Sequence, residues 1–108
     1  MKSKSILVMR FSSIGDIIQT TSTLSTIKEY LPNYSIDYLT LDHFKSILKN
    51  HKSLNKVYSI SKNAKYSHIS ELILKLQSNK YDYIIDLHNS PRSKAFSLFL
   101  KKSKINKS

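Results

Sequence analysis

The feature that most constrains the fold is a regular alternation of short apolar runs with longer amphipathic ones along the 108 residues. The short runs are rich in Ile, Leu, Val and Tyr: the first and the last are near-continuous, which is typical of strands buried on both faces of a parallel sheet, whereas the second alternates. They cover residues 6–9, 36–41, 57–60 and 83–87. A helix is expected after each run, so the order βαβαβαβα predicts an α/β fold with a parallel, Rossmann-like sheet and flanking helices.

Polar residues mark the expected helix starts, because their side chains can accept hydrogen bonds from free backbone N–H groups. The first helix is expected to open at Asp16 and to run to about Leu31, where Pro32 and Asn33 follow. In the third helix, apolar residues recur at a spacing that places them on one face. The candidate N-caps of the later helices are Asp42, Ser67 and either Asn89 or Ser90, the last with Pro91 in the first turn.

Length allows one compact domain. We assign residues 1–100 to a single Rossmann-like domain and residues 101–108 to a Lys-rich polar tail. A doubly wound domain usually continues for further strands. We therefore expect a truncated domain, and a complete four-stranded domain is the competing interpretation.

Composition excludes several kinds of site. The chain has no cysteine, which removes disulfides and thiolate chemistry, and the four histidines have no helical ligand spacing, so no metal is expected. The single glycine, Gly15, excludes the glycine-rich loops that bind dinucleotides or nucleoside triphosphates. No apolar run is long enough for a signal peptide or a membrane span, so we expect a cytoplasmic location.

The formal net charge of +11 comes from sixteen lysines and two arginines spread over every segment. Scattered lysines favour solubility over a dedicated polyanion surface. The charge leaves open a contact with an anionic membrane or a phosphorylated acceptor. A basic α/β module that binds nucleic acid or another polyanion is the alternative function, although the evenly apolar strands disfavour RNA binding.

A candidate site lies where two loops should meet. Ligands of such sheets bind beyond the carboxyl ends of the strands, at the point where the strand order reverses. In the common order 3-2-1-4, the first and fourth strands are neighbours, so the loops over residues 10–16 and 86–92 should converge. Together with Thr20 just beyond the first loop, they contain the candidate residues Arg10, Ser12, Ser13, Gly15, Asp16, Asp86, His88, Asn89 and Arg92.

These residues have alternative interpretations. Asp16 is either a helix-opening carboxylate or a general base that takes a proton from a hydroxyl group. Gly15 is expected at a corner that needs a positive φ or a close backbone approach. His88 either bonds to a neighbouring carbonyl or contacts a ligand. Arg92 in a first helical turn opposes the helix dipole unless it pairs with Asp86 or with a bound anion.

Two stretches resemble glycosyltransferase family 9, the ADP-heptose:lipopolysaccharide heptosyltransferases. Residues 6–21 resemble the family's opening strand, its Ser-Ser-apolar-Gly-Asp turn at residues 12–16, and the helix with threonines that follows. Residues 81–93 are similar to the family's second motif, in which Asp-Leu-His precedes Arg-Ser. Asn89 stands where the family often has glycine, and Pro91 is unusual in this loop.

The resemblance implies the N-terminal, acceptor-side half of a GT-B type glycosyltransferase, whose other half binds a nucleotide-sugar donor such as ADP-heptose. It implies inverting transfer to a lipid-linked glycan acceptor, with Asp16 as the base and no metal or other cofactor. Ser12, Ser13 and Gly15 correspond to positions near the donor diphosphate and the acceptor, and the segment 86–88 to the acceptor side. Without the donor half, the chain alone is expected to be inactive. A peripheral contact with the inner membrane is expected, and nucleic acid is not.

Overall fold

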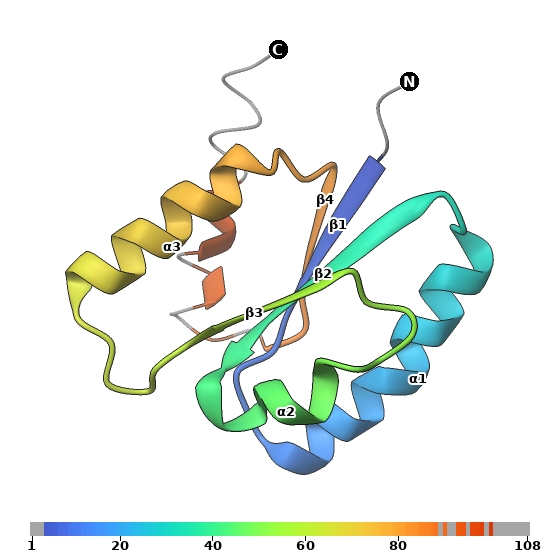
Figure 1. Cartoon of the computed structure of the whole chain (residues 1–108), viewed down its shortest axis with the longest axis horizontal. Coiled ribbons are helices and arrows are strands. Elements are labelled where there is room, and N and C mark those ends of the chain that lie inside the picture. Colours follow the sequence, from blue (N-terminus) through green and yellow to red (C-terminus); the bar gives the residue numbers. More distant parts are fainter. Residues whose placement is uncertain (1–3, 89, 91–92, 95, 99, 101–108) are drawn as a thin grey trace.

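The fold is described by a computed structural model, which covers residues 4–88, 90, 93–94, 96–98 and 100. Its strands form one sheet in the order β3-β2-β1-β4, and each neighbouring pair is parallel (Figure 1). This confirms the predicted α/β class, the element order and the placing of the first strand beside the fourth. The strands are β1 (Lys4–Met9), β2 (Tyr34–Leu41), β3 (Lys56–Ile60) and β4 (Tyr83–Asp86).

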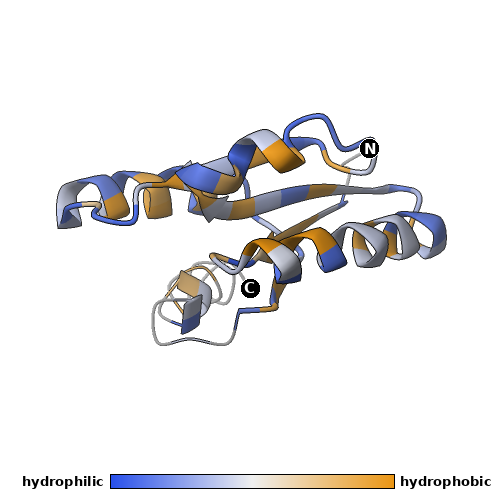
Figure 2. Cartoon of the chain, turned by 90° about the horizontal axis from the view of Figure 1, so that it is seen from below, coloured by the Kyte–Doolittle hydropathy of each residue, from blue (hydrophilic) through white to orange (hydrophobic). Residues whose placement is uncertain are grey.

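Helices cover both faces of the sheet. Helices α1 (Ile14–Tyr30) and α2 (Lys45–Leu48) pack on one face, and α3 (Tyr66–Ser78) packs on the other (Figure 1). A short 3-10 helix, η1 (Asp42–Phe44), leads from β2 into α2. Hydrophobic and hydrophilic residues alternate along the helices (Figure 2), as expected for helices with one buried side.

The central strand β1 contributes to the core on both faces. Ile6 and Val8 pack with α1 and α2, whereas Leu7 and Met9 pack with α3 and the helical residues near the C-terminus. Side chains alternate along a strand, so a strand covered on both faces must be apolar at successive positions. These four side chains are at most 1% exposed. Burial of each side chain contributes about 1.5–3 kcal/mol to stability. The loop after β1 therefore starts from a firmly packed strand.

Three helix starts differ from the sequence predictions. Helix α1 begins at Ile14, with Ser13 as its N-cap, so Asp16 lies in the first turn and does not open the helix. Leu41 is the last extended residue before η1, which makes Asp42 a residue of that helix and not its cap. Lys65 is the extended residue before α3, so Ser67 is already helical and cannot cap.

The last predicted helix is present in part, because residues 93, 94, 96–98 and 100 are helical. The Ser90 hydroxyl accepts a hydrogen bond from the Ser93 backbone N–H at 3.2 Å, which agrees with Ser90 as an N-cap. The predictions on Asn89, Pro91 and the tail at 101–108 lie outside the described residues. None of the described helices is long and apolar enough to cross a membrane.

Candidate functional site at the carboxyl ends of β1 and β4

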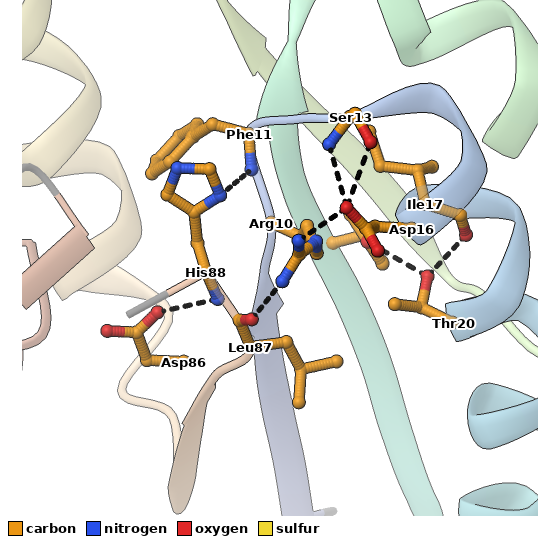
Figure 3. A network of polar contacts seen from close by, with 10 residues as sticks. Arg10, Phe11, Ser13, Asp16, Ile17, Thr20, Asp86, Leu87 and His88 are labelled. Carbon is orange, nitrogen blue, oxygen red and sulfur yellow. Dashed lines mark hydrogen bonds and ion pairs between the residues drawn. The ribbon is translucent and has the colours of Figure 1, made fainter. Parts of the chain in front are cut away.

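The loops after β1 and β4 lie side by side, as predicted. The two strands pair in parallel with Met9 opposite Asp86, so the loops that follow them leave the sheet at the same edge (Figure 3). Residues far apart in sequence therefore meet there. The site forms on either side of the β1 loop, residues 10–13.

Arg10 connects the two loops through its guanidinium group. One terminal nitrogen donates a hydrogen bond to the backbone oxygen of Leu87, just after β4. The other lies 2.8 Å from Oδ2 of Asp16 in an ion pair. Figure 3 shows the guanidinium between these partners. The side chain is 21% exposed, and its Nε atom is buried without a hydrogen-bond partner among the described residues.

Asp16 is bound through one of its two carboxylate oxygens. Oδ2 accepts hydrogen bonds from the Ser13 hydroxyl at 2.9 Å and, more weakly, from the Ser13 backbone N–H at 3.5 Å. The second bond is the side-chain half of a capping box, in which a residue three positions into a helix caps its start. The Ser13 hydrogen bond, followed by that from Arg10, lowers the pKa of Asp16 below its usual value of 3.8. Asp16 is therefore ionised at neutral pH, and half of its side chain is exposed.

Asp16 lines an open cavity of about 220 Å³ between α1 and the end of β4. Thr20 lies in its wall, and the Thr20 hydroxyl donates to the backbone oxygen of Ile17 at 2.6 Å. That bond uses the only hydroxyl hydrogen of Thr20, so Tyr38, 3.0 Å away, must be the donor in the second contact. The complete lining is Arg10, Asp16, Gln19, Thr20, Thr23 and Leu87.

Sequence reasoning missed Tyr38. It lies on β2, is fully buried, and holds the Thr20 side chain through the hydrogen bond between the two hydroxyl groups. Burial raises the pKa of its phenol, which keeps the phenol protonated as the donor to Thr20. The chain has seven tyrosines, and Tyr38 lies in an apolar run. No local signal in the sequence separates it from a tyrosine that only packs.

His88 lies on the other side of the β1 loop. Its Nδ1 atom accepts a hydrogen bond from the backbone N–H of Phe11 at 3.3 Å, and the two rings meet edge to face with centroids 5.4 Å apart. One interpretation of the sequence gave His88 a neighbouring carbonyl as partner. The structure gives it a backbone donor instead, so the neutral ring carries its proton on Nε2.

Asp86 fixes the backbone of this second loop. Its Oδ1 accepts from the His88 backbone N–H at 3.0 Å, and its Oδ2 accepts from the Ser93 hydroxyl at 2.8 Å. Asp86 thereby joins the end of β4 to the helical residues that follow.

A second cavity, of about 360 Å³, opens beside His88. The candidate residues thus divide into two groups: Arg10, Asp16 and Thr20 line the first cavity, whereas Ser12 and His88 line the second. Ser13 acts on the first through its bonds to Asp16. The complete lining of the second cavity is Phe11, Ser12, Leu41, Lys62, Asn63, His88 and Ser90.

Gly15 does not have the predicted backbone conformation. It lies in the first turn of α1, has no positive φ, and a Cβ atom added there would meet nothing within 4 Å. The corner is made by residues 10–13 before the helix starts, so the turn does not require glycine at position 15.

The predicted contributions of Asn89 and Arg92 lie outside the described residues. Within the part of the chain that the structure describes, no group of three or more His, Asp or Glu side chains could hold a metal ion.

No protein-family model matches the sequence. Curated relatives do match. Over 99 residues, 91% of this chain, it is 30% identical to lipopolysaccharide heptosyltransferase 1 of Campylobacter coli. Over 78 residues, 68% of the chain, it is 33% identical to lipopolysaccharide heptosyltransferase 3 of Escherichia coli strain K12. The chain belongs to the lipopolysaccharide heptosyltransferase family.

Solved structures agree on the fold. The crystal structure of a family 9 glycosyl transferase from Veillonella parvula matches 93% of this heptosyltransferase-like chain with a TM-score of 0.84 and 20% identity. The Escherichia coli heptosyltransferase WaaC, solved with ADP-2-deoxy-2-fluoro heptose, matches 85% of it with a TM-score of 0.75 and 21% identity. The chain spans 29% of the length of the Campylobacter coli relative, 30% of the Veillonella structure and 32% of the WaaC structure.

Proposed function

We propose that this chain is the acceptor-side part of a heptosyl-type glycosyltransferase. It would act with a donor-binding part to move a sugar from a nucleotide-sugar, such as ADP-heptose, to a lipopolysaccharide core or a related envelope glycan. The similarity to lipopolysaccharide heptosyltransferases supports the reaction class, and the neighbour solved with an ADP-sugar analogue supports the donor class. The single observation that carries the proposal is an ionised Asp16 at the edge of a cavity where the strand order reverses.

In the proposed reaction Asp16 accepts the proton of an acceptor hydroxyl. The hydroxyl oxygen attacks the anomeric carbon as the bond from that carbon to the nucleotide diphosphate breaks. Attack from the face opposite the leaving group inverts the anomeric centre. The lowered pKa keeps Asp16 in the form that can take the proton, although it also makes the carboxylate a weak base. Exclusion of water when donor and acceptor are bound would strengthen the base.

The second cavity is proposed to hold another part of the acceptor. His88 presents Nε2–H as a donor, and Ser12 and Lys62 add two more donors to the same cavity. Sugar oxygens and anionic substituents are acceptors, so their chemistry fits this lining. We further propose that the protein works on the cytoplasmic side of the inner membrane, where the lysines contact the anionic surface.

A chimera tests the proposal. The segment of Campylobacter coli heptosyltransferase 1 that aligns with this chain is replaced by the chain, and transfer from ADP-heptose to that enzyme's acceptor is measured. We expect transfer by the chimera, no transfer by the 108-residue chain alone, and loss of transfer in the Asp16→Asn chimera. Glu29→Gln is the matched control, because Glu29 is an exposed carboxylate near the far end of the same helix.

A folded chimera without activity, judged by circular dichroism and a cooperative melting curve, would contradict the proposal. Titration of the chain with double-stranded DNA and with RNA tests the alternative of a polyanion-binding module. Tight, steeply salt-dependent binding together with an inactive chimera would favour that alternative.

A further inference from the structure

We propose that Arg10 is a positioning residue, which holds Oδ2 of Asp16 so that Oδ1 is the oxygen that takes the acceptor's proton. The inference rests on the proposed function, and it adds an assignment of roles to the two oxygens of one carboxylate. It comes from how the described contacts of Asp16 are distributed.

All described contacts of Asp16 fall on the same oxygen. Oδ2 receives the Arg10 guanidinium at 2.8 Å, the Ser13 hydroxyl at 2.9 Å and the Ser13 backbone N–H at 3.5 Å. No described residue donates to Oδ1. Proton transfer requires a base held in the correct orientation, and contacts to one oxygen fix the carboxylate while the other oxygen stays accessible.

Arg10 is itself held from two directions. Its other terminal nitrogen donates to the backbone oxygen of Leu87, and its backbone N–H donates to the backbone oxygen of Leu39 at 3.1 Å. A guanidinium is a planar fork whose two terminal nitrogens bond in fixed directions, so one group can join β4 to the first turn of α1. Both terminal nitrogens contact the protein (Figure 3), which is why we assign Arg10 a positioning role and not a contact with substrate.

Few other charges surround Asp16 in the described part of the chain. From the loop after β1 the charged group is Arg10, and from β2 the titratable group is the buried phenol of Tyr38, which contacts Thr20. From the end of β4 come the Leu87 carbonyl and His88, whose Nδ1 bonds to Phe11. In α1 itself, Asp16 is the only charged residue before Lys28. Arg10 is therefore the cation whose removal should most change the titration of Asp16.

Two arms test the inference. The first follows the Asp16 carboxyl carbon by NMR in the 108-residue chain as pH is varied, in the parent and in Arg10→Gln, Arg10→Lys and Ser13→Ala. The second measures kcat and KM in the active chimera with the same substitutions. Arg10→Lys keeps the charge but lacks the fork, whereas Ser13→Ala weakens the hold on Oδ2 and leaves Arg10 unchanged.

We expect the pKa of Asp16 to rise in Arg10→Gln and in Ser13→Ala, because both side chains lower it in the parent. In the chimera we expect kcat to fall about tenfold or more in Arg10→Gln, the scale of a misplaced catalytic group, while KM for donor and acceptor changes by less than about twofold. Compared with Arg10→Gln, Arg10→Lys should restore part of the lowering of the Asp16 pKa but little of the lost kcat. The acid limb of the pH–rate profile should move to higher pH in Arg10→Gln and in Ser13→Ala.

Two results would overturn the inference: an Asp16 titration that is the same in Arg10→Gln as in the parent, or a raised KM with an unchanged kcat, which would make Arg10 a substrate contact. If Arg10→Gln does not fold, Ser13→Ala decides, and parent-like titration with parent-like kcat would overturn the role given to Oδ2. An inactive parent chimera instead counts against the proposed function, and the NMR arm still decides whether Arg10 holds Asp16.

Discussion

The backbone N–H of Phe11 donates a hydrogen bond to Nδ1 of His88 across the junction of β1 and β4, at 3.3 Å. The contact joins residues 77 positions apart and brings their rings into edge-to-face contact. It also sets which nitrogen of the neutral ring carries the proton, because an atom that accepts a hydrogen bond cannot carry it.

The first prediction follows from this contact. The ¹⁵N chemical shifts of the His88 ring at pH 8 should show the Nε2–H tautomer as the main neutral form. The exposed histidines, such as His68, serve as internal controls measured in the same spectrum. A predominant Nδ1–H tautomer at His88 would contradict both the hydrogen bond from Phe11 and the role of Nε2–H as a donor in the second cavity.

The second prediction concerns Asp16 in the active chimera. Asp16→Asn keeps the size of the side chain and an oxygen that can accept from Ser13, but it removes proton acceptance. We expect kcat to fall about 100-fold or more, the usual scale for loss of a general base. The melting temperature should stay close to that of the parent, since the group is exposed. Near-normal kcat in this variant would leave Asp16 as a helix cap only.

The third prediction concerns the pH dependence of the same carboxylate. Its folded-state pKa is lowered, so the ionised form gains stability in the native state, and this gain is fully present above the unfolded value near 3.8. It is lost as pH falls through the lower folded value. The parent should therefore be slightly more resistant to urea than Asp16→Asn at pH 6, with the difference shrinking below about pH 4. A constant difference from pH 6 to pH 2 would show that the charge of Asp16 is not what stabilises the helix start.

The fourth prediction concerns a buried polar cluster away from the site. The Tyr81 hydroxyl donates to Oδ2 of the buried Asp37 at 2.6 Å. Tyr81→Phe removes that donor from a buried carboxylate, so we expect a loss of about 1–3 kcal/mol in the free energy of unfolding. Tyr58→Phe is the matched control: among the described residues the Tyr58 hydroxyl accepts a bond from the exposed Asn79 amide, so its removal should cost less. Equal losses in urea unfolding would contradict this assignment.

Burial raises the pKa of Tyr81. The stability that this phenol contributes is fully present below its unfolded pKa of about 10 and is lost as pH rises above it. The stability difference between the parent and Tyr81→Phe should therefore become smaller above pH 10 than at pH 8.

The fifth prediction concerns Gly15. Because its backbone is helical and a Cβ atom would enter open space, Gly15→Ala should fold normally. We expect an increase of up to about 1 kcal/mol in the free energy of unfolding, since alanine has less conformational freedom to lose. Measured destabilisation would show that the turn does require glycine. A loss of transfer in the chimera without destabilisation would indicate that a substrate occupies the space beside residue 15.

Local pattern determined the framework of this protein. The short apolar runs predicted all four strands to within two residues, because strands buried in a parallel sheet are mostly apolar along their length. Element order then predicted which strands are neighbours, since parallel connections follow few topologies. The pairing of β1 with β4 followed, and with it the meeting of the loops that carry Asp16 and His88.

Tertiary structure decided how the polar side chains are used. Arg10 meets Leu87, and Phe11 meets His88, only because the register of β1 against β4 places them at the same height. Tyr38 on β2 contacts Thr20 on α1, and Asp37 on β2 accepts a hydrogen bond from Tyr81, which precedes β4. The helix starts were misplaced for a related reason: Asp42 and Ser67 are good caps by residue type, but the capping position goes to the last residue that remains extended. Residue type states which bonds a side chain can make, whereas strand register and the path of the backbone choose its partner.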